Sequence, residues 1–525
     1  MLSLLYSRQT ALVFASGMLL SLAFPKADLG LIAWVAFVPL VWVVWAGSLR
    51  QAFFYGWLGG MGFYLCSVYW VVHTIGLYSN IHPVVAVIPL FLMCSILAAY
   101  TGAFALGVRW CKGNWRWLLI FGPLLWVSLE WLRSFFFIGF PWVSLGYSQH
   151  RSLNLIQIAE LTSVYGISAL VIFGNLVVFT LAYKRGPGRG RLLVGTVALI
   201  LCVMAWGSWR RAQLASLPHD QRLRVGVVQG NIEQDEKWRP AFQAETIARY
   251  ARMTRQAAAQ DTGLIVWPET AVPFFFQSDH TYRGRILGLA REMKTPLLFG
   301  SPAFERGPRR VTLFNRAYLL SAEAEVVDRY DKIILTPFGE FIPFQDSFLF
   351  FLDKLVEGIG DFAPGTTPTV FPLPPHAFGV LICYESIFPD LARRFVEGGA
   401  TFLVNITNDA WFGRTAAPYQ HLMMGALRAV ENRVPLVRAA NTGISAVVDV
   451  TGAVQTRTQL NETTFFVEDL SWPRVTSFYT RYGDIFAHLC ALSCLGMLGY
   501  RSVRYYQRHV RKGGPHAGRV EGKTD

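Results

Sequence analysis

Cys383, in the segment L-I-C-Y-E-S, is the residue best suited to nucleophilic chemistry. The chain has seven cysteines, and six of them fall in or beside long apolar segments. Cys383 instead lies in a polar stretch that offers no partner for a disulfide. A free thiol has a pKa of about 8.5 and needs help to form a thiolate at neutral pH. For an isolated cysteine, the commoner role is that of a small buried hydrophobic residue, and Cys383 alone favours that role.

Two charged residues offer the help that this thiol needs. I-V-W-P-E-T places Glu269 just after an apolar run, and Y-D-K-I-I-L-T-P-F-G-E places Lys332 beside another, with Glu340 eight residues later. A carboxylate can take the thiol proton, and an ammonium can stabilise the thiolate and a tetrahedral oxyanion. A buried Glu–Lys ion pair with an unrelated cysteine remains the alternative, since composition does not exclude it.

An α/β domain must position these three residues, because each lies at the end of a short β-rich run or beside one. The runs predicted as strands are Leu223–Gln229, Leu264–Trp267, Pro296–Gly300, Gly379–Tyr384, Thr401–Asn405, Pro435–Ala440 and Ile444–Val450. Helical stretches such as Ala241–Gln260 and Phe388–Glu397 alternate with them. The site is therefore expected at three strand ends of one domain.

The composition places this domain in an integral membrane protein. Of 525 residues, 53% are hydrophobic and only 16% are charged, whereas soluble globular proteins carry about 25% charged residues. Disorder and a purely soluble fold are thereby excluded. The net charge of +14 does not indicate nucleic acid, because the basic residues form short runs between apolar segments, as in cytoplasmic loops.

The apolar segments predict an α-helical bundle of about eight spans. They are residues 10–24, 29–46, 52–73, 84–108, 117–135, 160–183, 192–208 and 484–501. We expect the first to be retained and not cleaved as a signal peptide. Basic loops around Arg50, Arg109 and Arg185 and a basic tail after Arg501 put both termini in the cytoplasm.

This topology divides the chain into four parts. A membrane domain of seven helices covers residues 1–208, the α/β domain covers residues 209–483, an eighth helix covers residues 484–501, and a basic cytoplasmic tail covers residues 502–525. With an odd number of spans before it, the α/β domain lies on the far side of the membrane. In a bacterial inner membrane that side is the periplasm.

The order W-P-E-T, D-K-x-x-L-T-P-F-G-E and I-C-Y-E resembles the Glu–Lys–Cys triad of the nitrilase (carbon–nitrogen hydrolase) superfamily. The arrangement of eight spans, with the nitrilase-like domain inserted before the last span, resembles that of the apolipoprotein N-acyltransferase family. Further matching segments are Val228–Asn231, Trp238, Leu403–Gly413, Arg428–Arg433, Arg438–Ser445, Leu129–Arg133 and Gly139–Trp142. The resemblance implies a nitrilase-like α-β-β-α sandwich.

The resemblance also implies roles for individual residues. Cys383 is the expected nucleophile, Glu269 the general base, and Lys332 the oxyanion donor, together with the backbone N–H of Tyr384. Glu340 and Glu385 are expected either to keep Lys332 charged and aimed or to anchor loops. Trp238 has a functional or a packing role. Scaffold roles are expected for Asn408, Asp409, Arg428, Glu431 and Arg438.

The implied reaction is acyl transfer through a Cys thioester, from a phospholipid (phosphatidylethanolamine by resemblance) to the α-amine of a diacylated apolipoprotein. The alternatives are a membrane-anchored thiol amidase or nitrilase-type hydrolase, and a transporter or receptor whose outer domain binds ligand. No metal or diffusible cofactor is implied, since the His and Cys spacings form no ligand set. We expect a monomer that contacts membrane lipid and no nucleic acid.

Two further expectations concern loops and the membrane interior. The apolar segments Val272–Gln277 and 338–352 directly follow catalytic candidates and are expected to be interfacial or lid loops. Glu130 and Arg133 are three residues apart on one helical face and are expected to satisfy one another, with a lipid head group as the alternative partner.

Overall fold

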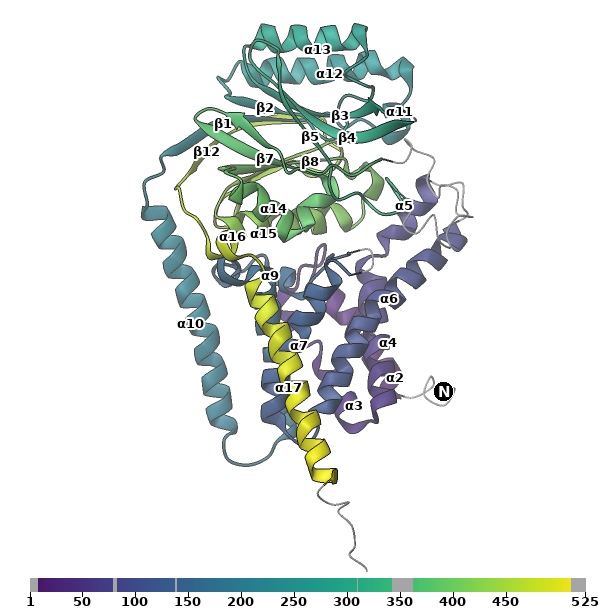
Figure 1. The fold of residues 1–525 in the computed structure, drawn as a ribbon, viewed down its shortest axis with the longest axis vertical. Helices are drawn as coiled ribbons and strands as arrows, with labels where there is room; N and C mark the ends of the chain where they lie inside the picture. Colours follow the sequence, from purple (N-terminus) through teal and green to yellow (C-terminus); the bar gives the residue numbers. More distant parts are fainter. Residues whose placement is uncertain (1–7, 79–82, 137–138, 309, 342–361, 511–525) are drawn as a thin grey trace, which may run out of the picture.

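The computed structural model describes residues 8–78, 83–136, 139–308, 310–341 and 362–510. Figure 1 shows a helical part and an α/β part stacked along the long axis of the molecule. Helix α10 leads from the helical part into the α/β part, and α17 leads back from it. The α/β part is therefore an insertion before the last long helix.

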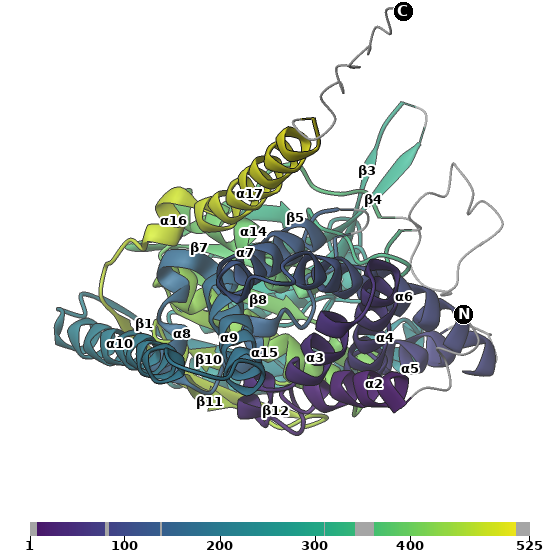
Figure 2. The same ribbon diagram turned by 90° about the horizontal axis from the view of Figure 1, so that it is seen from below.

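The helical part is built from the N-terminal elements together with α17. Its elements are α2 (Arg8–Ser21), η1 (Gly30–Trp34), α3 (Val38–Ala46), α4 (Leu49–Ser67), α5 (Trp70–Tyr78), α6 (Pro83–Trp110), α7 (Trp115–Arg133), η2 (Leu145–Gln149), α8 (Leu153–Ile156), α9 (Ala159–Tyr183), α10 (Arg189–Ser216) and α17 (Ile485–Val510). In Figure 2, α10 lies at one edge of this part, with α2, α4 and α6 toward the opposite side.

Among the described residues, four helices are long and apolar enough to cross a bilayer. They are Val84–Trp110, Ala159–Tyr183, Arg189–Ser216 and Ile485–Arg504. The pair Leu49–Ser67 and Trp70–Gly76, bent by 56°, makes a fifth if it forms one broken span. Membrane helices are thus confirmed, but the predicted number of about eight is not. The remaining three predicted segments fall on α2, which has only 14 residues, on the short η1–α3 segment, and on α7, which contains Arg116, Glu130 and Arg133.

Small residues allow the membrane helices to approach closely. A Cβ on Gly17 of α2 would lie 2.0 Å from the carbonyl oxygen of Gly59 in α4. A Cβ on Gly60 of α4 would lie 2.8 Å from the Cα of Ala98 in α6. Such contacts are typical of helix packing in lipid.

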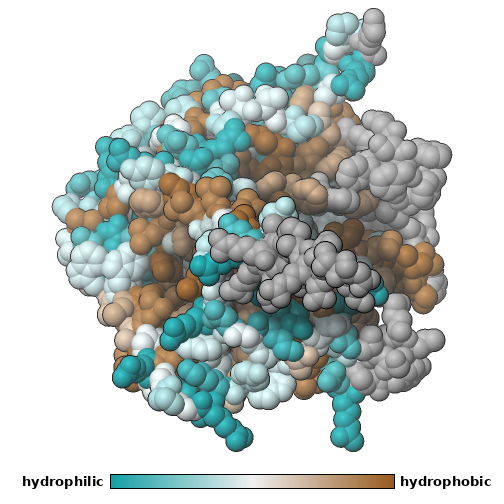
Figure 3. All heavy atoms as spheres, turned by 60° about the horizontal axis from the view of Figure 1, so that its bottom comes forward, coloured by the Kyte–Doolittle hydropathy of each residue, from teal (hydrophilic) through white to brown (hydrophobic). Residues whose placement is uncertain are grey.

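The outer surface of the helical part is apolar. Figure 3 shows patches of hydrophobic side chains on the visible face, interspersed with hydrophilic ones. Exposed apolar side chains on these helices include Leu12, Val84, Ile88, Val194, Leu201, Leu492 and Leu495. Hydrocarbon is the solvent that such a surface fits.

The α/β part contains two six-stranded sheets. The first has the order β12-β1-β2-β3-β4-β5 and the second the order β11-β10-β9-β8-β7-β6. The strands are β1 (Gln221–Gln229), β2 (Leu264–Val266), β3 (Leu297–Arg306), β4 (Val311–Leu320), β5 (Val326–Asp331), β6 (Val370–Leu373), β7 (His376–Ile382), β8 (Phe402–Thr407), β9 (Leu436–Ala440), β10 (Ala446–Val448), β11 (Val454–Arg457) and β12 (Thr464–Trp472). Strands β1, β2 and β3 run parallel in the first sheet, as do β7, β8 and β9 in the second.

Helices cover both outer faces of the paired sheets (Figure 1). Their bounds are α11 (Gln234–Lys237), α12 (Pro240–Ala258), α13 (His280–Met293), η3 (Cys383–Ile387), α14 (Pro389–Glu397), η4 (Asp409–Phe412), α15 (Ala417–Asn432) and α16 (Phe478–Tyr482). Helices α12 and α13 lie on the side away from the membrane helices, and α14 and α15 lie on the side facing them. The predicted α/β domain is confirmed, with the layers α-β-β-α.

The seven predicted strands correspond to β1, β2, β3, β7, β8, β9 and β10. One boundary is wrong in a way that matters for the site: β7 ends at Ile382, so Cys383 and Tyr384 lie in η3 and not in the strand. The sequence analysis did not identify β4, β5, β6, β11 and β12. These strands are short or carry charges, as in T-F-F-V-E-D-L-S-W of β12, and their apolar patterns are therefore weak.

Buried polar side chains connect the α/β part to the helical part. Arg433, which follows α15, contacts Glu160 of α9 and donates hydrogen bonds to Gln157 Oε1 at 2.7 Å and to the Val450 carbonyl at 2.8 Å. Arg210 of α10 binds the same Glu160 at 2.8 Å. These contacts fix the orientation of the two parts.

Replacing Arg433 by leucine is expected to destabilise the protein by about 3 kcal/mol, because it leaves buried acceptors without donors. The measurement is the midpoint of thermal unfolding in detergent. Arg329→Leu, at an arginine whose side chain is 58% exposed, is the control and is expected to change the midpoint little. Equal midpoints for the two variants would show that the junction contributes no stability.

Candidate active site

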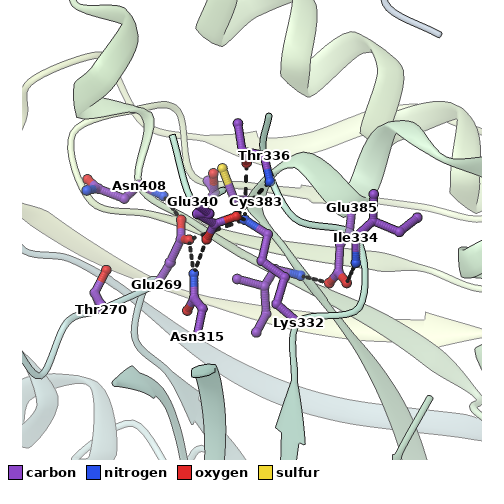
Figure 4. Close-up of polar contacts among 12 residues, drawn as sticks. Glu269, Thr270, Asn315, Lys332, Ile334, Thr336, Glu340, Cys383, Glu385 and Asn408 are labelled. Carbon is purple, nitrogen blue, oxygen red and sulfur yellow. Dashed lines mark hydrogen bonds and ion pairs between the residues drawn. The ribbon is translucent and has the colours of Figure 1, made fainter. Parts of the chain in front are cut away.

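Three strand ends bring the predicted site residues together, as Figure 4 shows. Glu269 follows β2 after Trp267 and Pro268, and Lys332 follows β5 directly. Cys383 follows β7 directly, so the site combines two strands of the first sheet with one of the second. Cys383 has a φ of 52°, a left-handed conformation that costs a non-glycine residue about 1–3 kcal/mol. This conformation turns the chain sharply out of β7 at the candidate nucleophile.

Lys332 is buried between two carboxylates. Its Nζ lies 2.7 Å from Glu340 Oε2 and 3.8 Å from Glu269 Oε1, and it donates a hydrogen bond to Thr336 Oγ1 at 3.3 Å. Burial by itself lowers the pKa of an amine, but the charges of Glu340 and Glu269 raise the pKa of Lys332 above its ordinary value. The ammonium is therefore a permanent positive charge in the site.

Both oxygens of the Glu269 carboxylate are held in place. Asn315 Nδ2 donates to Oε1 at 2.7 Å, and the backbone N–H of Asn408 donates to Oε2 at 2.8 Å. The same Asn315 amide donates to Glu340 Oε1 at 2.8 Å. Asn315 thus ties together the two carboxylates that flank Lys332, a role that the sequence analysis missed.

The surroundings of Cys383 favour the protonated form of its thiol. Burial and the negative charge of Glu269 raise the pKa of Cys383, while the ammonium of Lys332 acts in the opposite direction without overcoming them. The thiol, the carboxylate and the ammonium occupy one small region (Figure 4). This arrangement fits a nucleophile that is deprotonated by a neighbouring base as it attacks.

Glu385 anchors the backbone around the site and makes no hydrogen bond to the Lys332 ammonium in the described structure. Its carboxylate accepts hydrogen bonds from the Tyr330 hydroxyl at 2.7 Å and from the backbone N–H groups of Ile333, Ile334 and Ile382 at 2.7, 3.0 and 2.7 Å. It therefore joins the chain after β5 to the end of β7. Burial raises the pKa of Glu385 to about 7, opposed by these N–H groups and by Lys332. Of the two roles expected for Glu385, the geometry fits the loop anchor.

Replacing Glu385 by glutamine is expected to cost about 2–3 kcal/mol of stability and to slow any reaction at the Cys383 thiol at least tenfold, because one end of the amide places a donor against N–H donors. Thermal unfolding and thiol reaction rates measured side by side would check this. The matched variant Glu323→Gln changes an exposed residue and should leave both quantities near those of the parent. A fully active Glu385→Gln protein would contradict the anchoring role.

The two aromatic candidates lie in different settings. The Tyr384 hydroxyl donates a hydrogen bond to the carbonyl of Gly139 at 3.1 Å, which connects the residue after the nucleophile to a loop of the helical part. Trp238 follows α11 and is half-buried. Its neighbour Lys237, which the sequence analysis missed, is buried, and its Nζ donates to the backbone carbonyl of Glu269.

A buried ionic network supports the turn that carries Cys383. Asp409 pairs with Arg438 at 2.7 Å and with His421 at 3.1 Å, and His421 Nε2 lies 3.0 Å from the Cys383 carbonyl oxygen. Burial raises the pKa of a carboxyl, but Arg438 and His421 hold the pKa of Asp409 below its ordinary value. The predicted scaffold role fits Asp409 and Arg438, and His421 is a further member that sequence reasoning missed.

The remaining predicted scaffold residues lie before α15, in the case of Asn408, or within it, in the case of Arg428 and Glu431. Asn408 donates its backbone N–H to Glu269, as described above. Arg428 pairs with Glu431 at 2.9 Å and donates to the Tyr147 hydroxyl of the helical part at 2.8 Å. Glu431 also accepts a hydrogen bond from Ser163 of α9 at 2.6 Å.

The expectation of a lid at Val272–Gln277 is wrong. Val272, Phe274 and Phe276 are buried in the core between the first sheet and α12 and α13. This segment has no regular secondary structure, so its apolar side chains show no helix or strand period. They are nevertheless buried in the core. Of the segment 338–352, the structure describes residues 338–341, where Phe338 is 37% exposed. The rest of that segment lies outside the described residues.

The expected direct pairing of Glu130 with Arg133 is also not found among the described residues. Arg133 donates hydrogen bonds to the Tyr64 hydroxyl and, at 2.9 Å, to Ser144 Oγ. Glu130 Oε1 accepts the backbone N–H of Leu145 at 2.7 Å. Both side chains therefore bond polar groups of other segments inside the bundle, while Glu130 Oε2 and Arg133 Nε have no hydrogen-bond partner among the described residues.

Nothing in the described part of the chain groups three or more His, Cys, Asp or Glu side chains in a way that could hold a metal ion. Glu269, Lys332 and Glu340 instead contact one another or Asn315, as the distances above show. The chemistry open to this arrangement is nucleophilic attack by a thiol on an acyl carbon.

Two family models match the chain. Residues 16–177 match the apolipoprotein N-acyltransferase N-terminal domain, and residues 224–479 match carbon–nitrogen hydrolase. Among solved structures, an amidase from Nesterenkonia sp. aligns with a TM-score of 0.39 at 21% identity, covering 52% of this chain and 97% of that one.

Proteins named apolipoprotein N-acyltransferase match over nearly the full length. One from Geobacter metallireducens is 44% identical over 92% of this chain and 93% of its own. One from Methylococcus capsulatus is 36% identical over 84% and 86%, and one from Chlorobaculum tepidum is 30% identical over 95% and 96%. The chain therefore belongs to the apolipoprotein N-acyltransferase family.

Proposed function

We propose that this protein transfers a fatty acyl chain from a phospholipid, through a thioester on Cys383, to the free α-amine of the S-diacylglyceryl-cysteine of an apolipoprotein. The observation that carries the proposal is the buried set of Glu269, Lys332 and Cys383 at three strand ends of the α/β part. Tyr384, the residue after the nucleophile, bonds the helical part directly. This contact between the site and the helical part supports lipid substrates.

In the first half-reaction, Glu269 takes the proton of the Cys383 thiol as the sulfur attacks the ester carbonyl carbon. The carbonyl oxygen becomes an oxyanion, which the Lys332 ammonium and the backbone N–H of Tyr384 stabilise. The ester C–O bond then breaks, and the proton on Glu269 passes to the departing lysophospholipid oxygen. A thioester remains on Cys383.

In the second half-reaction, the α-amine of the lipoprotein attacks the thioester carbon. Glu269 takes a proton from the attacking nitrogen, and Lys332 again stabilises the oxyanion. The C–S bond breaks, and the proton returns from Glu269 to the sulfur. The product is an amide, and no electrons are exchanged with a cofactor.

Burial of the site favours transfer over hydrolysis. Cys383 is 8% exposed, Glu269 6% and Lys332 1%. A water-poor site protects a thioester until an amine arrives. Withdrawing a lipid tail from hydrocarbon costs about 0.8 kcal/mol per CH₂. The enzyme must therefore bind its donor and acceptor within the bilayer, which explains why the catalytic domain is fused to membrane helices.

We further propose a topology for this arrangement. All eight apolar segments predicted above cross a bacterial inner membrane, both termini are cytoplasmic, and the catalytic part lies in the periplasm. The membrane domain then comprises residues 1–208, the catalytic domain residues 209–483, the last span residues 484–501 and the cytoplasmic tail residues 502–525. Support comes from the basic residues of the loops and tail. The enzyme acts as a monomer, with phosphatidylethanolamine as donor.

The same triad could serve a hydrolase, which would release its acyl group to water. The deciding experiment supplies radiolabelled phosphatidylethanolamine and a diacylated lipopeptide with a free N-terminus to the detergent-purified protein. We expect label in a triacylated peptide amide and little in free fatty acid. Fatty acid released equally well without the peptide would instead identify a hydrolase.

An N-acetylated lipopeptide is the matched control for the acceptor. Because it lacks the attacking amine, it should receive no label while the donor and enzyme stay the same. Labelling of the blocked peptide would contradict transfer to the α-amine.

A further inference from the structure

Lys237 is a buried amine beside the catalytic triad that the proposed mechanism leaves without a task. It ends α11, in the connection between β1 and α12, and its side chain is 2% exposed. Its charge interacts with Glu269 and Cys383. An unused lysine is rarely buried at such a position, since taking an ammonium out of water is costly.

The contacts of Lys237 are with a turn and not with an acid. Its Nζ donates to the backbone carbonyl of Glu269 at 3.2 Å and to Thr270 Oγ1 at 3.0 Å. Within the described ranges, no carboxylate oxygen lies within ion-pair distance of this amine. Lys332, by contrast, has Glu340 at 2.7 Å. The site therefore holds two amines, one with a tight ion pair and one without.

The turn that Lys237 holds is constrained from two sides. Thr270 has a φ of 46°, in the left-handed region. On the other side, a Cβ on Gly300 of β3 would lie 2.5 Å from the Thr270 nitrogen and 2.8 Å from the Glu269 Cα. Lys237 and Gly300 thus enclose the backbone that sets the direction of the Glu269 carboxylate.

We propose that Lys237 is a positioning residue for acyl transfer: its side chain holds the Glu269–Thr270 turn, and its charge supplies a second positive potential that favours the Cys383 thiolate. This proposal rests on the proposed function, because it takes Glu269 as the base and Cys383 as the nucleophile. It adds a group that neither the sequence motifs nor the triad includes.

A change of pH distinguishes the two contributions of Lys237, its hydrogen bonds to the turn and its positive charge. Burial lowers the pKa of Lys237 to about 7, although the negative charges of Glu269 and Cys383 act to raise it. A neutral amine still has two N–H donors, so the turn stays bonded when the proton is lost. The positive charge, however, is present below about pH 7 and is lost as the pH rises. Lys332 keeps its charge throughout because its pKa is raised by Glu340 and Glu269.

The rate of thioester formation should therefore decline on the alkaline side with a midpoint near pH 7. The experiment mixes the full-length protein in detergent with excess phosphatidylethanolamine and follows the adduct in a single turnover from pH 5.5 to 9. Lys237→Arg, which retains a charge at every pH, is expected to lose this decline. Lys237→Met is expected to react at least tenfold more slowly at pH 6 and also to show no decline near pH 7.

Lys294→Met is the matched control, since Lys294 is an exposed lysine at the end of α13. It should reproduce the rate and the midpoint of the parent. If Lys237→Met keeps both quantities, or loses rate while the alkaline midpoint stays, the proposal is overturned. If the methionine variant does not fold, the comparison of the parent with Lys237→Arg still tests the proposal. The proposal then requires an alkaline decline in the parent and none in Lys237→Arg.

Failure of the proposed function would look different. A parent protein that forms no thioester at any pH would overturn the catalytic assignment itself. A parent that forms one with an alkaline midpoint unaffected by Lys237→Arg would overturn the role of Lys237 alone.

Discussion

Acyl transfer is expected to fall by roughly 10⁴-fold or more when Cys383 is replaced by alanine, because the residue that forms the intermediate is removed. The remaining Glu269 and Lys332 can bind and polarise an ester but cannot accept its acyl group. The turn should survive, since His421, which contacts Asp409, lies against the Cys383 backbone carbonyl. Initial rates of lipopeptide acylation, measured at equal protein concentration, check the expectation.

Cys202→Ala provides the control for this variant. Cys202 is an exposed thiol of α10, far along the chain from the site. We expect unchanged acylation and a parent-like unfolding midpoint. Substantial transfer by Cys383→Ala, with Cys202→Ala equally active, would exclude Cys383 as the nucleophile.

The second large effect is expected at Lys332. Replacing it by methionine removes the positive charge that faces the oxyanion and should lower kcat/KM by about 10³-fold. It also leaves Glu340 and Glu269 buried without their shared counter-charge, which should destabilise the protein by about 3–5 kcal/mol. Steady-state kinetics and thermal unfolding together measure the two consequences.

Lys332→Arg tests whether charge alone is enough. The Nζ of Lys332 is enclosed by Glu340, Glu269 and Thr336, and a guanidinium is larger and planar. We expect the arginine variant to recover part of the stability but little of the activity. Full activity in either variant would show that Lys332 does not face the reacting carbonyl.

The triad was predictable because its residues stand in recognisable segments at strand ends. Glu269 follows a Trp-Pro pair, Lys332 precedes a β-branched run, and Cys383 ends an apolar run. Candidate site residues at strand ends can be predicted from the local sequence without knowing the rest of the fold. The α/β part was predictable for the same reason, since its central parallel strands are continuous apolar runs.

The residues that hold the triad were not predictable, because nothing local marks them. Asn315 is one polar residue within β4, and it meets Glu269 only through the pairing of sheet strands. His421 lies on α15, 38 residues from Cys383. Lys237 lies one residue before Trp238 in E-K-W. That neighbourhood is the one local signal, and it points first to the aromatic side chain of Trp238.

Apolar composition proved ambiguous about location. The run around Phe274 and Phe276 reads like an exposed lid but fills the core. In α7, Arg116, Glu130 and Arg133 reduce the mean hydropathy of a predicted span, but Glu130 and Arg133 turn inward to polar partners. Composition gives the amount of apolar surface, whereas tertiary contacts decide whether that surface faces the protein core, lipid or water.

The thioester on Cys383 is best sought by intact-protein mass spectrometry of the chain purified from membranes in mild detergent, beside Cys383→Ser. We expect a mass increase of one fatty acyl group on the parent chain, removal of that mass by hydroxylamine, and no such adduct on the variant. Addition of a diacylated lipopeptide should discharge the adduct to the peptide amide. Absence of any adduct after phospholipid is supplied, or an equal adduct on Cys383→Ser, would contradict a thioester mechanism at this site.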